Sequence, residues 1–227
     1  DNVLSRMITR RILTPYQRKL AKIGKRGFFP FTVWVVCFVV YFLTMPTTLS
    51  WGLNDYGIDS PEFLTSAMVT SNPHPPGYPL YSLILRGFIE IVPAGDVAFK
   101  GNLLSVVFGC FTASLLYILI RNLITICSRA SSECWWGISS ALFGVAFYIF
   151  CPLVWGTSLV TEVYSLNSFF CVLLFLLFIG MLKTDSESDT PNTICRSGFF
   201  LISGLAIANH LTVIAIILPM SVCLLVF

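Results

Sequence analysis

Residues 28–45, FFPFTVWVVCFVVYFLTM, form the first long apolar run of the chain and indicate its fold class. A helix that crosses a membrane needs about 20 consecutive apolar residues, and further apolar runs follow at 102–127, 135–152, 166–182 and 197–227. Only 11% of the 227 residues are charged, against about 25% in a soluble domain. The sequence therefore predicts an all-α polytopic membrane protein.

Residues 1–26 precede this run and are strongly basic. They contain a single acid, Asp1, and eight basic side chains: Arg6, Arg10, Arg11, Arg18, Lys19, Lys22, Lys25 and Arg26. Loops with positive charge remain in the cytosol. We therefore predict a cytosolic N-terminal segment over 1–26, in preference to a patch that binds nucleic acid or anionic lipid. Residues 46–101 are then a long loop on the outer, lumenal side.

A transmembrane helical module is predicted over residues 27–227. Its spans are expected at about 28–45, 102–127, 135–152, 166–182, 197–208 and 211–227. The last two depend on a hinge near Asn209, and one long helix is the alternative. The chain begins with Asp1 and stops within an apolar run, so we expect an N-terminal fragment of a longer protein. The eight cysteines lack paired or metal-type spacing, which predicts neither disulfides nor a metal site.

The outer loop contains a polar segment at 51–81, WGLNDYGIDSPEFLTSAMVTSNPHPPGYPLY. The sequence Asp59-Ser60-Pro61-Glu62 is typical of a helix start, with the helix running to about Thr70. A second short helix is predicted at 81–91, too short to span a membrane.

Four polar clusters share the outer side in this topology. Ionisable residues at a membrane boundary are costly and often functional, and acids beside a histidine suit proton abstraction. The clusters are Asp55, Asp59 and Glu62; His74 with its prolines; Glu162, Tyr164 and Asn167; and Asn209 with His210.

Each cluster also has a structural interpretation, which the sequence leaves open. Asp59 and Glu62 have the spacing of a capping box, to which we give the same weight as catalysis. The remaining alternatives are a solvated turn for Asp55, a structural role for His74 in a proline-shaped loop, a helix end for Glu162, an aromatic belt for Tyr164 and a hydrogen bond across the bundle for His210.

The motifs DSPEF (59–63), PHPPGYPLY (73–81), TEVYSLN (161–167) and GLAIANHLT (204–212) occur in this order along the chain. With them the sequence resembles, across its whole length, the eukaryotic transmembrane protein O-mannosyltransferases that modify plexin-type receptor domains, and their bacterial relatives. The resemblance implies a GT-C glycosyltransferase with a helical bundle and a catalytic acid in the first outer loop. It also implies transfer from a polyprenyl-phosphate sugar, which in the eukaryotic members is dolichyl-phosphate mannose in the endoplasmic reticulum.

By motif position, the resemblance implies that Asp59 is the general base and that Glu62 orients the acceptor or supports Asp59. The residues expected to bind the donor are Asp55, His74, Tyr78, Tyr81, Glu162, Tyr164, Asn167, Asn209 and His210. The sugar-lipid is a co-substrate, and no other cofactor is expected. The expected partners are membrane lipid, the dolichyl-phosphate-linked sugar and a secretory-pathway acceptor protein, and not nucleic acid.

Two points remain open from the sequence. Arg86 is either the cation that binds the donor phosphate or a snorkelling side chain. The alternative function is a membrane transporter or channel in which the acids and histidines relay protons, although no internal repeat typical of transporters is found.

Overall fold

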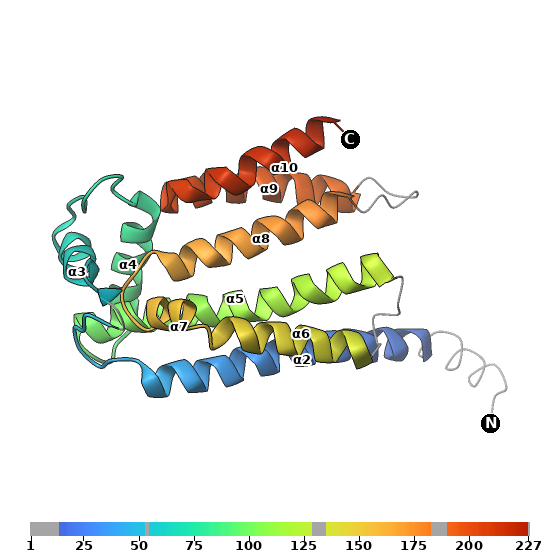
Figure 1. Cartoon of the computed structure of the whole chain (residues 1–227), viewed down its shortest axis with the longest axis horizontal. Coiled ribbons are helices and arrows are strands. Elements are labelled where there is room, and N and C mark those ends of the chain that lie inside the picture. Colours follow the sequence, from blue (N-terminus) through green and yellow to red (C-terminus); the bar gives the residue numbers. More distant parts are fainter. Residues whose placement is uncertain (1–13, 53–54, 129–134, 183–189, 227) are drawn as a thin grey trace, which may run out of the picture.

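Long antiparallel helices form a bundle in the computed structural model, which describes residues 14–52, 55–128, 135–182 and 190–226 (Figure 1). Within these ranges every regular element is a helix, which confirms the predicted all-α fold. The long helices are α2 (Thr14–Thr44), α5 (Val97–Ser128), α6 (Trp135–Ile149), α8 (Tyr164–Leu182), α9 (Thr190–Asn209) and α10 (Ile214–Val226). The short ones are α3 (Ser60–Val69), α4 (Pro79–Ile91), α7 (Pro152–Ser158) and the 3-10 helix η3 (Leu211–Val213).

Three of the described helices are long and apolar enough to cross a membrane, over Gly27–Thr44, Val97–Cys127 and Tyr164–Leu182. The pair α6 and α7 makes a fourth if it is counted as one bent span, while α9 and α10 carry shorter apolar segments. The chain is therefore a multi-pass membrane protein. The sixfold crossing expected from the sequence stays a prediction.

Several helix boundaries differ from those expected. Helix α2 begins at Thr14 and so continues through the predicted boundary at residue 26. Helix α5 begins at Val97 instead of residue 102, because Asp96 Oδ1 accepts a hydrogen bond from the Phe99 N–H at 2.7 Å, in the manner of an N-cap. Helix α9 begins at Thr190 instead of residue 197. Residues 1–13 of the basic segment lie outside the described residues.

The run predicted as one helix over 135–152 is bent instead. Helix α6 ends at Ile149, and α7 leaves it at 66°. Pro152 forces the preceding Cys151 into an extended conformation (φ −63°, ψ 124°). The Ile149 carbonyl at the break accepts a bond from the buried Tyr41 hydroxyl at 2.8 Å. This satisfies a backbone group that lipid could not.

The hinge expected near Asn209 is present, and the alternative of one long helix is wrong. Helix α9 ends at Asn209, and His210 has an extended backbone (φ −157°, ψ 128°). The His210 side chain accepts a bond from the Thr212 N–H and so caps η3.

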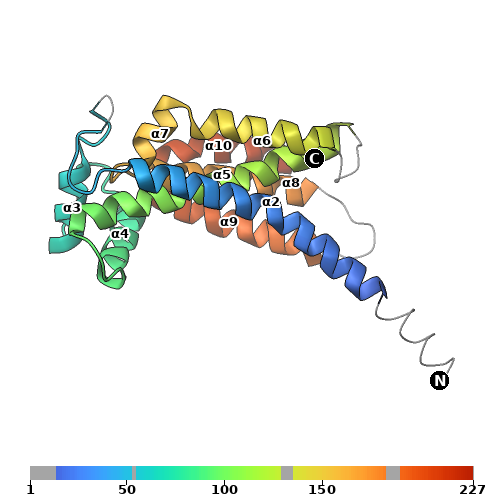
Figure 2. The same ribbon diagram turned by 90° about the horizontal axis from the view of Figure 1, so that it is seen from below.

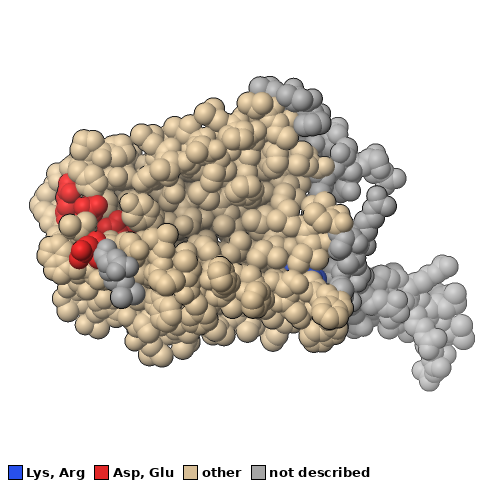
Figure 3. All heavy atoms as spheres, viewed as in Figure 1, with Lys and Arg blue, Asp and Glu red and all other residues tan. Residues whose placement is uncertain are grey.

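These breaks and the short helices lie at one end of the bundle. In both ribbon views α3 and α4 cover the end opposite to the start of α2 and the end of α10 (Figures 1 and 2). On the face seen in Figure 3 the acidic side chains gather at this end, over α3. The fold therefore brings the outer loop and the turns α7–α8 and α9–α10 together, where the sequence predicts its polar clusters.

Candidate active site

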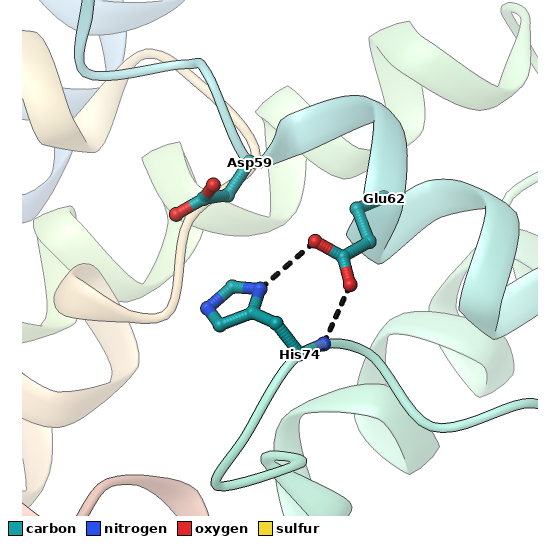
Figure 4. A group of neighbouring side chains, drawn as sticks. All are labelled: Asp59, Glu62 and His74. Atoms are coloured by element: carbon teal, nitrogen blue, oxygen red, sulfur yellow. Dashed lines mark hydrogen bonds and ion pairs between the residues drawn. The ribbon is translucent and has the colours of Figure 1, made fainter.

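Glu62 and His74 form the best-defined pair of the site (Figure 4). Glu62 Oε2 lies 2.9 Å from His74 Nδ1, and Oε1 accepts a bond from the His74 backbone N–H at 2.5 Å. These two bonds hold the pKa of Glu62 below its ordinary value. The carboxylate thereby fixes both the imidazole and the loop that carries it.

Asp59 precedes the first residue of α3 but does not cap the helix with its side chain. Figure 4 shows its carboxylate unbonded to Glu62 and His74. Because Glu62 bonds to His74 and not to the start of its own helix, the capping-box interpretation of the two residues is wrong. Among the described residues, Asp59 thus presents a half-buried carboxylate that bonds neither to the start of α3 nor to Glu62 or His74.

Glu162 lies beside Asp59 although the two are more than 100 positions apart. It is 2% exposed, within the turn between α7 and α8. Burial and the charge of Asp59 raise its pKa to about 8, opposed by bonds from the backbone of Val163 and Asp59. Glu162 is therefore largely protonated at neutral pH. It does not end a helix at the lipid interface, so that interpretation is wrong.

An aromatic group extends the site toward the α9–α10 break. The Tyr78 hydroxyl lies 3.4 Å from His74 Nε2, and the Tyr78 ring lies 5.5 Å from the ring of His210. The ring centroid of Tyr164 lies 5.9 Å from that of His210. Burial, and then the neighbouring Tyr164, Asp59, Glu162 and Glu62, raise the pKa of Tyr78.

Tyr78 has a backbone conformation that side chains seldom adopt. Its φ is 40° and ψ 55°, in the left-handed region, between Gly77 and the first residue of α4, Pro79. Such a conformation costs about 1–3 kcal/mol at a non-glycine residue. This is an observed outlier at the residue that joins His74 to His210, which favours a functional role for Tyr78.

The remaining predicted site residues lie in different places. Asn167 donates to the Thr212 hydroxyl at 3.4 Å, and Asn209 is 1% exposed at the end of α9. Tyr81 is buried, with the Glu162 carboxyl and the Ser105 hydroxyl near its own hydroxyl, and burial raises its pKa. Asp55 is an exposed turn residue with φ 60° and takes part in none of the described contacts of the site. This agrees with the interpretation of Asp55 as a solvated turn residue.

Arg86 does not reach the cluster. It pairs with Glu90 at 3.0 Å on α4 and donates to the hydroxyl of Thr70 at the end of α3. These contacts join the two short helices, so a structural role explains Arg86 without a phosphate.

A buried polar network that the sequence analysis missed holds the site together. Asn102 donates to the carbonyls of Pro46 and Thr48 and accepts from the Thr161 hydroxyl. Two further bonds hold the turn that carries Glu162: the Ser60 hydroxyl donates to the Thr161 carbonyl at 2.9 Å, and the Glu162 N–H donates to the Ser105 hydroxyl at 3.3 Å. The sequence feature that indicates this network is Asn102 within an apolar run, because polar residues in transmembrane helices usually have a function.

One potential ligand atom from each of Asp59, Glu62 and His74 lies within 4.8 Å of the others. That spacing suits a divalent cation, but both oxygens of Glu62 already accept bonds from His74. The absence of a metal stays a prediction.

The arrangement can perform proton transfer at a polar substrate. It offers one carboxylate free to accept a proton, one buried carboxyl that carries a proton, and an imidazole oriented by a glutamate. Aromatic side chains line the same end, as is common in sites for small molecules.

Comparison of the sequence with known proteins finds a matching family. Residues 59–227 match the model of the "Protein O-mannosyl-transferase TMEM260 N-terminal domain". A mouse protein named protein O-mannosyl-transferase TMEM260 is 35% identical over 179 residues, covering 79% of this chain and 23% of the mouse protein. The Dictyostelium discoideum protein of that name is 27% identical over 154 residues, covering 67% of this chain and 16% of its own. The chain thus spans less than a quarter of either relative. No solved structure matches it significantly.

Proposed function

The chain belongs to the family of the protein O-mannosyl-transferase TMEM260 N-terminal domain, and from this we propose that it is the membrane part of a protein O-mannosyltransferase. The sugar is mannose from dolichyl-phosphate mannose, the acceptor is a Ser or Thr hydroxyl, and the transfer inverts the anomeric centre. The fold is then a GT-C-type bundle, and the reaction takes place on the lumenal face of the endoplasmic reticulum.

The observation that carries this proposal is the meeting of Asp59 and Glu162 at the end of the bundle formed by the outer loop. Asp59 follows the first span, and Glu162 lies between α7 and α8. A structural subunit has no need of two acidic side chains at one site, one of them buried with a raised pKa. Acid–base catalysis does, because one acid can take a proton while the other, kept neutral by burial, donates a hydrogen bond.

In the proposed reaction the Asp59 carboxylate takes the proton of the acceptor hydroxyl. The acceptor oxygen forms a bond to the anomeric carbon of mannose, while the bond from that carbon to the phosphate oxygen breaks. Dolichyl phosphate leaves with the electron pair. Asp59 suits the role of base because its oxygens accept no bond from the start of α3, whereas those of Glu62 are bonded to His74.

The other residues bind and position in this proposal. Glu62 orients His74 through two hydrogen bonds, and His74 in turn contacts the Tyr78 hydroxyl. His74 and Tyr78 lie near Asp59 and offer hydrogen bonds to a donor phosphate. The lipid tail lies along the apolar flank of the bundle, and the acceptor is a secretory-pathway protein.

The test is Asp59→Asn in the full-length protein, assayed with dolichyl-phosphate mannose and a plexin-type receptor domain. Loss of a general base lowers a rate by about 100-fold or more, so we expect transfer to fall that far while the protein still binds the donor. Glu90→Gln is the matched control, because it also removes a carboxylate from this loop. The only described partner of the Glu90 carboxylate is the exposed Arg86.

Wild-type transfer by Asp59→Asn would show that Asp59 is not the base. A wild-type protein that forms no glycosylated product, but moves a substrate across proteoliposomes, would instead support the transporter alternative.

A further inference from the structure

Three buried polar atoms of two asparagines near the α9–α10 break lack hydrogen-bond partners among the described residues. Asn209 is 1% exposed, and neither its Nδ2 nor its Oδ1 is bonded. The Oδ1 of Asn167 is buried and unbonded as well. A buried polar group without a partner costs about 1–3 kcal/mol, so each such group calls for an explanation. A ligand that supplies the missing bonds is one.

The two amides belong to the same end of the bundle. Asn167 lies in the first turn of α8 and Asn209 in the last turn of α9, and these helices pack antiparallel along each other (Figure 1). Asn167 also contacts Thr212, and the Thr212 hydroxyl lies 2.7 Å from His210 Nδ1. Thr212 thus links Asn167 to His210, and Asn209 directly precedes His210 at the end of α9.

His210 adds a hydrogen-bond donor there. Its Nδ1 accepts the Thr212 N–H at 3.2 Å, which places the proton of the neutral ring on Nε2. Burial lowers the pKa of His210 and favours this neutral form. In the described part of the chain the Nε2–H has no partner, so it can donate to a ligand.

Two aromatic rings lie next to the ring of His210. The ring centroid of Tyr78 is 5.5 Å from that of His210, and that of Tyr164 is 5.9 Å away. Tyr78 also contacts His74, with ring centroids 5.4 Å apart. The region around His210 is thus next to the proposed reaction centre and shares Tyr78 with it.

The unmet bonds specify the chemistry of the ligand. The Asn209 amide needs one donor and one acceptor, Asn167 needs a donor, and His210 needs an acceptor. A phosphate offers only acceptors when ionised, and so would leave both amide carbonyls unpaired. Sugar hydroxyls both donate and accept, and two adjacent ones can bond to both ends of one amide.

We propose that Asn167, Asn209 and His210, with the rings of Tyr78 and Tyr164 beside His210, form the subsite for the sugar ring of the lipid-linked donor. This rests on the proposed function and adds to it that the sugar is recognised at the α9–α10 break, apart from Asp59. The Asn209 amide binds two hydroxyls of one sugar. The subsite therefore discriminates between sugars that differ in the orientation of a hydroxyl.

The test compares Asn209→Ala with Ser203→Ala in the full-length protein. Ser203 is on the same helix, also buried and also without a partner among the described residues, so it controls for loss of a buried polar group. We measure binding of dolichyl-phosphate mannose and of dolichyl phosphate without sugar. Loss of two neutral hydrogen bonds weakens binding by about tenfold. We expect Asn209→Ala to weaken binding of the mannosyl lipid to that extent, with dolichyl phosphate unaffected and Ser203→Ala like wild type.

Three other outcomes would overturn the proposal. Equal weakening for both lipids would place Asn209 at the phosphate or in the fold, and unchanged binding of the mannosyl lipid would show that Asn209 does not contact the sugar. Both of these outcomes would leave the proposed function, O-mannosyl transfer, uncontradicted. If wild-type protein does not bind dolichyl-phosphate mannose at all, the proposed function fails together with the subsite. Should Asn209→Ala not fold, Asn167→Ala tests the same subsite with the same two lipids.

Discussion

The carboxyl group of Glu162 is buried beside Asp59, and this proximity gives the site a dependence on pH. Burial and the charge of Asp59 raise the pKa of Glu162 from 4.5 to about 8. The folded protein therefore binds this proton more tightly than the unfolded chain does. The contribution of Glu162 to stability is complete below pH about 4.5, decreases as the pH rises toward about 8, and is lost above that value.

Glu162→Gln should remove this dependence, because an uncharged amide of the same shape keeps the acceptor for the Asp59 N–H. We expect the wild type to lose thermal stability between pH about 5 and about 9, and the variant to lose less over the same range. The measurement is the unfolding temperature in detergent as a function of pH.

Glu90→Gln, which changes an exposed glutamate on α4, serves as the control and should follow the wild-type profile. If Glu162→Gln loses stability as steeply as the wild type, another group causes the pH dependence.

At the scale of elements, the site depends on the close approach of α5, α3 and the turn before α8. Gly101 on α5 lies where these meet. A Cβ there would lie 2.7 Å from the Leu64 side chain and would also collide with the Thr161 hydroxyl. Thr161 is fully buried and bonded to Asn102, so it has no room to move. A glycine is required here for packing and not for backbone conformation.

Gly101→Ala should therefore destabilise the protein and lower transfer. Overpacking costs about 1–3 kcal/mol, which exceeds the gain of up to about 1 kcal/mol that alanine brings to a helix. The decisive measurements are the unfolding temperature and the rate of transfer from dolichyl-phosphate mannose.

Gly204→Ala is the matched control, since Gly204 is also within a helix and a Cβ there meets nothing within 4 Å. It should be neutral or slightly stabilising. A Gly101→Ala variant with wild-type stability and activity would contradict the close packing of α5 on the turn that carries Glu162.

For the whole molecule, the separation of charge between the two ends predicts its orientation. The described acids of the outer loop lie at the end formed by α3 and α4 (Figure 3), and the basic segment 1–26 precedes the start of the first span. Because positive segments remain cytosolic, we predict that the candidate active site faces the lumen.

An introduced glycosylation site tests this orientation, because the chain has no Asn-x-Ser/Thr sequence of its own. A glycosylation site inserted after Gly95, in the exposed turn between α4 and α5, should acquire a glycan in the endoplasmic reticulum. The measurement is a mass shift on a gel that is reversed by an endoglycosidase.

An identical insertion within 183–189, predicted as an inside loop, should remain unmodified. Glycans at 183–189 and none after Gly95 would invert the topology and place Asp59 in the cytosol, which is incompatible with the proposed donor.

Much of the fold was predictable from local sequence, and the errors have local causes. Apolar runs located the long helices because hydrophobicity alone decides which segments can enter a membrane. Helix α5 begins before its apolar run because Asp96 caps it. The bend after Ile149 has no signature in hydrophobicity, because a proline such as Pro152 can follow the end of one helix or begin the next.

The sequence by itself determined that this is a multi-pass α-helical protein of the TMEM260 N-terminal family, with its acids and histidines in four motifs on one side. Only the tertiary structure decided how these side chains pair. In the structure Glu62 bonds to His74, and Asp59 does not cap α3. Glu162 is buried beside Asp59, and the Asn209 amide has no partner among the described residues. Membrane insertion follows from the composition of each run separately. Pairing between motifs about 100 residues apart follows from how α3, α5 and the α7–α8 turn pack, which no single segment encodes.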